Sequence, residues 1–410
     1  MTQHPFRSIA SSEIPVVADL QARSFLDDYD RYLESYAGGG RVDHRALRLY
    51  ENQAGQPVAA LNVFNRAMSL GGGELEAALV ASVSVPPEWR RRGYARRMMA
   101  ALLEELYGQQ TPLSLLFPFS AGWYRGLGYG LVAFTWMLNL APRLLPDFPE
   151  RMNVRRVTSE DRDEIRGCYQ QARRLPRNNG WLARTDWEWQ HRVWKPGHQA
   201  VAYRGEDGVE GYLVFTLEYG AEGVVCEVLE WIWTSGAAWR GLAGFLASQG
   251  DQAGSVRYNA PQGDPLLPAL PEPYDRRGRS EKFVFFPAAK LLSGYMARVI
   301  HLPSALAQRC YPAGLRADFV LEVADAQLPA NGRPLRVAIR AGRAEVAAVD
   351  RTPSAVARTD MATFSQLFAG VVSPEQARTA GSLQAGDEVC AALQAAFAAA
   401  PWHMWQADWF

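Results

Sequence analysis

The stretch that decides the fold reads VSVPPEWRRRGYA, residues 83–95. A short Val-x-Val run ends at two prolines, and three arginines then lead to Gly93. Beyond it, Met98 and Leu102 begin an apolar pattern of helical spacing. Glycine adopts backbone angles closed to other residues, and the free N–H groups of a first helical turn attract anions. The stretch therefore predicts a strand–loop–helix unit that cradles a pyrophosphate.

The spacing Arg90-x-x-Gly93-x-Ala95 resembles the acetyl-CoA loop of the GNAT acetyltransferases, which reads Arg/Gln-x-x-Gly-x-Gly/Ala. The alternative is a basic, solvated turn that happens to begin a helix. The preceding strand and the following amphipathic helix favour the acetyl-CoA loop. The residues expected to contact acetyl-CoA are Val83, Val85, Arg90, Arg91, Arg92, Gly93, Ala95, Arg96 and Ser120.

A second signal lies at residues 115–130, LLFPFSAGWYRGLGYG, where an apolar run meets a proline and a glycine-rich turn. GNAT proteins place a tyrosine here, with its hydroxyl near the thioester sulfur. A phenol has a pKa of about 10, so it holds its proton at neutral pH and can give it to a departing thiolate. Tyr124 is the candidate. Tyr129 is the rival, with packing in the turn as its other role.

Composition limits the class of protein. The chain has 410 residues, enough for two or three domains, and 48% of them are hydrophobic. Lys+Arg and Asp+Glu are both 43, which argues against a nucleic-acid binder that works by bulk charge. The four cysteines are scattered without metal-ligand spacing, so no metal is expected. The chain shows no secretory leader or membrane-spanning run, which predicts a soluble, cytoplasmic protein without a membrane partner.

Prolines near residue 148 and a change of pattern near residue 290 divide the chain. We expect domains at 1–148, 149–289 and 290–410. The second domain repeats a strand, at residues 225–233, and a helix from about residue 237, but the loop between them lacks the arginine cluster. This suggests a GNAT-like domain that has lost acetyl-CoA binding, with an unrelated α/β domain as the alternative. In the third, strands followed by helices suggest an α+β unit.

An active GNAT unit, a degenerate second one and an α+β tail opened by Met-x-Arg-Val resemble the enhanced intracellular survival (Eis) family of bacterial acetyltransferases. The likeness covers essentially the whole chain. It implies tandem α/β GNAT-like domains, then an α+β domain that resembles sterol carrier protein. It also implies acetyl-CoA as co-substrate, amines as acceptors, either of small molecules such as aminoglycosides or of lysine side chains, and assembly as a hexamer.

The family resemblance also assigns a role to the aromatic tail, residues 401–410. In similar enzymes the chain-terminal carboxylate enters the active site and assists amine deprotonation, and here that group belongs to Phe410. A free α-carboxyl has a pKa of about 3.3–3.7, so it is ionised at neutral pH. Simple closure of a domain interface is the alternative role of the tail. His403 is a rival base.

Acids and aromatics alternate at helical spacing over residues 25–36. Such a face suits a polycationic amine through charge and cation–π contact, although a solvated helix with an aromatic core stripe explains it equally well. The candidate substrate-binding residues are Phe25, Asp27, Asp28 and Tyr36.

The sequence therefore predicts direct acetyl transfer. The amine, deprotonated near Phe410, attacks a thioester carbonyl polarised by backbone N–H groups of residues 83–85, and Tyr124 protonates the sulfur. Neither motif contains a cysteine, so no acyl-enzyme is expected. A protein-lysine acetyltransferase and a non-catalytic acetyl-CoA-binding scaffold are the alternatives.

Overall fold

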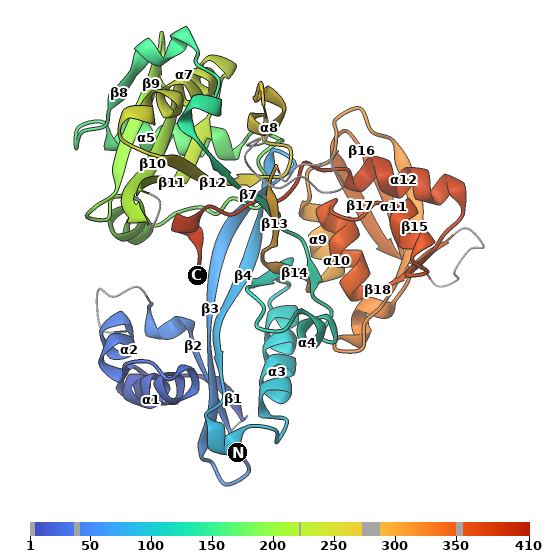
Figure 1. Ribbon diagram of the computed structural model, residues 1–410. Coiled ribbons are helices and arrows are strands. Elements are labelled where there is room, and N and C mark those ends of the chain that lie inside the picture. Colours follow the sequence, from blue (N-terminus) through green and yellow to red (C-terminus); the bar gives the residue numbers. More distant parts are fainter. Residues whose placement is uncertain (1–4, 37–41, 221–222, 273–287, 350–355) are drawn as a thin grey trace, which may run out of the picture.

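The computed structural model describes residues 5–36, 42–220, 223–272, 288–349 and 356–410. Within them the chain forms two seven-stranded sheets and one five-stranded sheet, and the C-terminus lies in the interior between the first two sheets (Figure 1). Within the same residues, no helix is long and apolar enough to cross a membrane.

The first sheet has the order β1-β2-β3-β4-β5-β14-β6. Its strands are β1 (Phe6–Ser8), β2 (Leu47–Glu51), β3 (Pro57–Leu70), β4 (Gly73–Ser84), β5 (Leu113–Leu116), β14 (Met296–Val299) and β6 (Gly130–Leu131). Its helices are α1 (Ile14–Phe25), α2 (Tyr29–Tyr36), α3 (Tyr94–Gly108) and α4 (Ala121–Arg125). The apolar face of α3, including Met98 and Leu102, is fully buried against this sheet, as its spacing predicts.

The second sheet has the order β13-β7-β12-β11-β10-β9-β8. Its strands are β13 (Lys290–Ser293), β7 (Phe134–Leu140), β12 (Ser255–Pro261), β11 (Gly223–Trp233), β10 (Gly208–Gly220), β9 (Gln199–Gly205) and β8 (Val154–Arg156). Helices α5 (Arg162–Arg173), α6 (Asp186–Glu188), α7 (Gly236–Ala247) and α8 (Leu266–Ala269) belong to this part.

The third sheet has the order β17-β16-β15-β18-β19. Its strands are β17 (Arg343–Ala348), β16 (Leu335–Arg340), β15 (Ala317–Ala324), β18 (Val356–Asp360) and β19 (Leu383–Gln384). The accompanying helices are α9 (Leu302–Gln308), α10 (Met361–Ala369), α11 (Pro374–Thr379) and α12 (Asp387–Phe397). One core joins this part to the first sheet, because Leu79 and Phe364 belong to the same buried cluster. Two α/β units followed by an α+β unit confirm the expected fold class.

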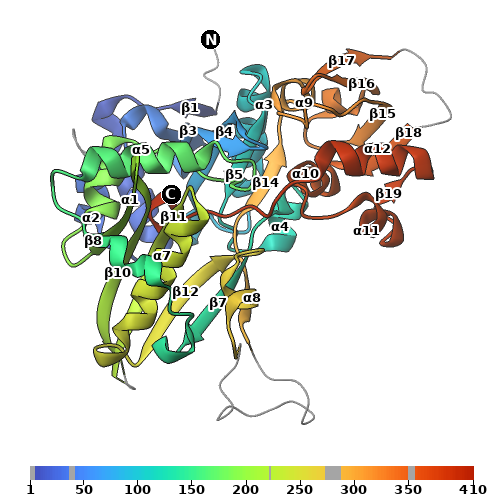
Figure 2. The same ribbon diagram turned by 90° about the horizontal axis from the view of Figure 1, so that it is seen from above.

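The chain does not pass from one sheet to the next at residues 148 and 289, where the sequence suggested domain boundaries. β7 precedes the first boundary but pairs with β12 of the second sheet. β14 follows the second boundary but lies between β5 and β6 of the first sheet (Figure 2). The prolines near 148 therefore mark a turn of the chain and not a change of sheet, and the exchanged strands join the two units.

Candidate active site

The predicted acetyl-CoA loop joins β4 to α3. Gly93 is the N-cap of α3 and has φ 79°, a left-handed angle that favours glycine. No side chain caps the helix, so the N–H groups of its first turn remain available to an anion. Arg91 is also left-handed, with φ 59°. The residues present therefore fit the pyrophosphate of acetyl-CoA.

The arginines of the loop differ in their contacts. The Arg90 guanidinium donates to the carbonyl oxygens of Val85, at 3.0 Å, and Ser24, at 2.7 Å, so it holds the loop against the end of α1. Arg92 lies over the ring of Trp89, at 4.9 Å. Arg91 and Arg96 are exposed. Arg90 therefore has a structural task besides any contact with the ligand, a distinction that the sequence does not show.

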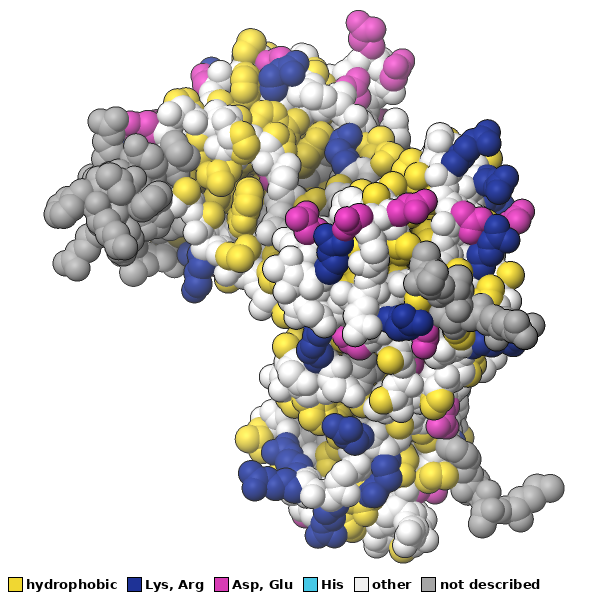
Figure 3. Space-filling model, turned by 90° about the vertical axis from the view of Figure 1, so that its right-hand side faces the viewer, with side chains coloured by type: hydrophobic (Ala, Val, Ile, Leu, Met, Phe, Trp, Pro, Cys, Tyr) yellow, Lys and Arg dark blue, Asp and Glu magenta, His cyan; other side chains and the backbone are white. Residues whose placement is uncertain are grey.

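Lys and Arg side chains gather at the lower end of the face in Figure 3, the end to which α3 extends in Figure 1. Around the start of α3, Arg91, Arg92, Arg96 and Arg97 are exposed and have no carboxylate partner within the described ranges. Such unpaired charge attracts a polyanion such as the phosphates of acetyl-CoA.

β4 and β5 separate next to this loop. Their parallel pairing ends at Val80 and Leu116, whereas β4 continues to Ser84. A bulge interrupts the pairing of β4 with β3, and Ser82 within it has φ 51°. Strained residues and bulges of this kind concentrate at functional sites. The segment that contains Val83 and Val85 thus has no β5 partner on one side, so its backbone is open to a ligand between the strands.

Tyr124 lies in α4, and Ser120, exposed, is the N-cap of that helix. The Tyr124 ring is buried against Phe119 and Trp123, with centroids 5.3 and 4.8 Å away. Burial, with a smaller contribution from Tyr129, raises the pKa of Tyr124 above its usual value, so the hydroxyl holds its proton. That is the state a general acid needs.

The hydroxyl of Tyr129, the alternative proton donor, already has a hydrogen-bond partner. The residue is fully buried, and its hydroxyl shares a hydrogen bond of 2.8 Å with Ser114 Oγ. Burial raises its pKa to about 12. The Tyr129 hydroxyl is thus already engaged by Ser114, which favours Tyr124 as the proton donor.

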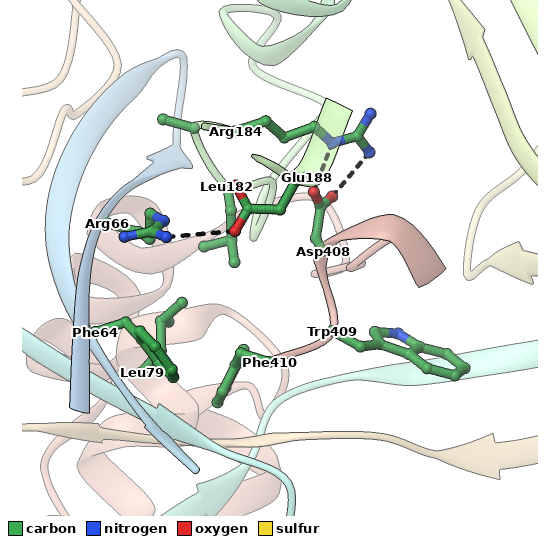
Figure 4. Close-up of a pocket in the computed structure, with 10 residues that line it drawn as sticks. Phe64, Arg66, Leu79, Leu182, Arg184, Glu188, Asp408, Trp409 and Phe410 are labelled. Atoms are coloured by element: carbon green, nitrogen blue, oxygen red, sulfur yellow. Dashed lines mark hydrogen bonds and ion pairs between the residues drawn. The ribbon is translucent and has the colours of Figure 1, made fainter. Parts of the chain in front are cut away.

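Phe410 lies where the strands separate. Its ring is 5.2 Å from that of Phe117, directly after β5. Phe410 borders one cavity with Phe64 and Leu79 (Figure 4) and a second, of about 630 Å³, with Ser82. The terminal residue thus reaches the bulged part of β4, and the entry of its carboxylate into the active site stays a prediction.

A buried charge cluster anchors the tail. Arg184 Nε donates to Asp408 Oδ1 at 2.6 Å, and the same guanidinium pairs with Glu230. The Arg184 and Asp408 side chains are each 1% exposed. Tyr169 donates to Asp408 at 3.1 Å, and Tyr212 donates to Glu230 at 2.8 Å. The second domain therefore fixes the chain two residues before its terminal carboxylate.

The alternative base, His403, is unsuited to proton transfer at neutral pH. It is buried, with its ring 4.5 Å from Trp405. Burial lowers the pKa of His403 to about 3. His403 is therefore neutral at pH 7 and offers no charge to an ammonium group, whereas the terminal carboxylate is ionised.

The four candidate substrate-binding residues separate into two groups. Asp27 and Tyr36 border the cavity that Ser82 and Phe410 also border, whereas Phe25 and Asp28 do not. Asp28 instead accepts from the backbone N–H of Asp30 at 2.8 Å and stabilises the start of α2. The helical spacing of residues 25–36 could not distinguish these tasks, because α1 ends at Phe25 and a turn intervenes.

The corresponding loop of the second domain is closed to an anion. Ser235 caps α7 by accepting from the Ala238 N–H at 3.1 Å, and it donates to Glu210. A carboxylate therefore occupies the helix end where a phosphate would bind, and it repels one. Trp231 and Trp239 stack there, 5.9 Å apart. This geometry supports the expectation that the second domain does not bind acetyl-CoA.

Within the described ranges, no group of three or more His, Cys, Asp or Glu side chains is arranged so that it could hold a metal ion. All four cysteines are unpaired thiols, of which Cys310 alone is exposed among those described.

Comparisons with known proteins agree with this arrangement. Residues 5–132 and 180–299 each match a family described as acetyltransferase (GNAT) domain, and residues 302–405 match the sterol carrier protein domain. An uncharacterized N-acetyltransferase of Streptomyces griseus is 27% identical over 350 residues, which are 78% of each chain. The chain is a GNAT acetyltransferase with Eis-like architecture.

Solved structures share the fold of this Eis-like acetyltransferase along its whole length. A GCN5-related N-acetyltransferase from Anabaena variabilis has a TM-score of 0.84 at 21% identity, with 99% of each chain covered. A GCN5-related N-acetyltransferase from Kribbella flavida has a TM-score of 0.80 at 23% identity, with 99% of this chain and 98% of that chain covered. Eis1 from Mycobacterium abscessus has a TM-score of 0.78 at 20% identity, with 99% of this chain and 100% of that chain covered. The GNAT match of the second domain excludes the unrelated α/β domain.

We predict that Arg92→Ala with Gly93→Asp weakens acetyl-CoA binding by roughly tenfold or more. The aspartate places a negative charge at the helix N-terminus, and a side chain at φ 79° strains the loop. Calorimetry on the folded double variant measures the affinity. Gly93→Ala is the matched control, since it adds the strain without the charge, and it should lose less. An unchanged affinity in the double variant would remove this loop from the site.

We also expect one acetyl-CoA to bind per chain. The first loop offers an open helix end, whereas Glu210 and Ser235 close the second. Calorimetric titration gives the stoichiometry directly. Two sites of similar affinity would contradict the assignment of the second domain as degenerate.

Proposed function

We propose that this Eis-like acetyltransferase transfers the acetyl group of acetyl-CoA directly to a primary amine of a small molecule, with its own C-terminal carboxylate assisting amine deprotonation. The observation that carries the proposal is the position of Phe410, between the bulged part of β4 and Phe117 at the end of β5. GNAT domains use acetyl-CoA, so the donor follows from the family.

The residues divide the chemistry as follows. The ionised carboxylate of Phe410 attracts the ammonium and accepts its proton, directly or through water. The amine nitrogen then forms a bond to the acetyl carbon as the carbon–sulfur bond breaks. Backbone N–H groups near Val83 and Val85 stabilise the carbonyl oxygen. Tyr124, kept protonated by burial, gives its proton to the departing thiolate. The attacking nitrogen loses its second proton as the amide forms, and this proton restores Tyr124, directly or through water.

The sequence suggested a polycationic acceptor such as an aminoglycoside. Three carboxylates in the cavities beside Phe410 support cation binding, Asp27 in one cavity and Glu188 and Asp408 in the other. Each has an arginine partner, however: Arg31 lies 2.9 Å from Asp27, Arg66 lies 3.3 Å from Glu188, and Arg184 lies 2.6 Å from Asp408. The terminal carboxylate is then the main uncompensated charge, which suits one ammonium group best. Assembly as a hexamer stays a prediction.

A thiol-release assay across a panel of amines tests the proposal. The panel holds aminoglycosides, polyamines, a lysine peptide, simple alkylamines and a blank without amine. We expect thiol release that depends on the amine, with mass spectrometry showing an acetylated amine. Release at the same rate in the blank, or tight acetyl-CoA binding with no transfer to any amine, would contradict the proposal and favour a hydrolase or a scaffold.

A further inference from the structure

A large, mostly apolar cavity also borders Phe410, and Asp27 is not part of its lining. It has a volume of about 1320 Å³ and is open to solvent. Phe117 and the tail residues Trp409 and Phe410 border it on one side. The second sheet borders it on the other, through residues of β11, β12 and β13. We call this space the apolar cavity.

The lining of the apolar cavity contains no Asp, Glu, Lys or Arg among the described residues. Its titratable side chains are Tyr295, whose pKa burial raises, and His403, which is neutral at pH 7. A second cationic group would find no counter-ion there, and burying one without a partner is strongly unfavourable. The lining therefore favours an uncharged occupant.

Aromatic rings line the mouth of the apolar cavity. The Phe117 ring is 6.2 Å from Trp409 and 5.9 Å from Tyr295. Phe117 and Trp409 are nevertheless 39% and 44% exposed, which is high for such large rings. An apolar ligand between them would remove that surface from water.

We propose that the acceptor is an amine with one cationic group and an aryl or alkyl portion, and that this portion occupies the apolar cavity while the amine lies at the Phe410 carboxylate. The inference rests on the proposed function. It follows from two features that share Phe410: an apolar cavity without charges, and neighbouring cavities whose carboxylates are already paired with arginines.

A series of primary alkylamines, from ethylamine to hexylamine, tests the inference together with phenylethylamine and spermidine. We expect kcat/KM to rise by about fourfold per methylene as the chain fills the cavity. Hexylamine and phenylethylamine should exceed spermidine. If ethylamine is acetylated but the longer amines gain nothing, the inference fails while the proposed function stands. If no amine is acetylated, the proposed function itself fails.

Two adjacent leucines of β13 give a matched pair of variants. Leu292 borders the apolar cavity, whereas Leu291 does not and is 57% exposed. Leu292→Trp should lower kcat/KM for hexylamine at least tenfold and leave ethylamine nearly unchanged, and ethylamine turnover also reports that the variant is folded. Leu291→Trp should change neither. If Leu292→Trp does not fold, Leu292→Glu replaces it and should discriminate against hexylamine in the same way. Equal hexylamine activity in the folded Leu292 and Leu291 variants would overturn the inference.

Discussion

Adding residues after Phe410 is expected to lower kcat by roughly 10²–10⁴-fold, the usual contribution of acid–base catalysis. One added residue moves the negative charge by about 3.3–3.6 Å. It also forces an apolar tail out of a place enclosed by Phe64, Leu79 and Phe117. Steady-state rates of the extended and native chains, with acetyl-CoA affinity measured in parallel, give the result. Affinity should change little, because the loop at Gly93 is separate.

Phe410→Leu is the matched control for the extension. It keeps the carboxylate at its place and removes only the ring, so appreciable turnover should remain. A truncation is informative only if it removes Trp409 and Phe410 and keeps Asp408. Without Asp408, the buried Arg184 would keep Glu230 but lose one of its two carboxylate partners. An extended chain with full activity would remove the carboxylate from the mechanism.

Tyr124→Phe should keep acetyl-CoA affinity and lose turnover by roughly 10²–10⁴-fold. The substitution removes the proton donor but preserves the ring that packs against Phe119 and Trp123. Pre-steady-state thiol release separates the chemical step from product release.

Tyr129→Phe is the control for this variant. It removes the hydroxyl bonded to Ser114 in the core, so it should cost stability, about 1–3 kcal/mol, with turnover of the folded protein retained. Near-normal turnover of Tyr124→Phe would mean that another group donates the proton. The opposite pattern in the two variants would assign the role to Tyr129.

The parts of the site that the sequence revealed depend on local patterns. A strand, three arginines, Gly93 and an amphipathic helix lie within one short stretch, and the geometry of such a unit follows from neighbouring residues. Tyr124 and the aromatic terminus are local signals as well. The sequence could not rank the arginines, because the carbonyl groups that bind Arg90 include that of Ser24, on a different helix.

Features that depend on distant contacts were not visible. The alternation of β7 and β14 identifies them as strands but does not say which sheet each one joins. Arg184 and Asp408 are 224 positions apart, and neither has a local signature. An apolar tail that ends in Asp-Trp-Phe was a usable hint, since a buried aspartate needs a cation. Ser82 looked like an ordinary strand residue, and only the register of β3 against β4 reveals the bulge.

The central claim is that the α-carboxylate of Phe410 takes part in acetyl transfer. Its most direct test converts that carboxylate to the carboxamide by ligating a synthetic C-terminal segment, with the same ligation to the free acid as reference. The two proteins differ by one charge and keep every side chain. We predict that the amide binds acetyl-CoA as the acid does but acetylates the best amine of the panel at least a hundredfold more slowly. Equal rates for acid and amide would contradict the account.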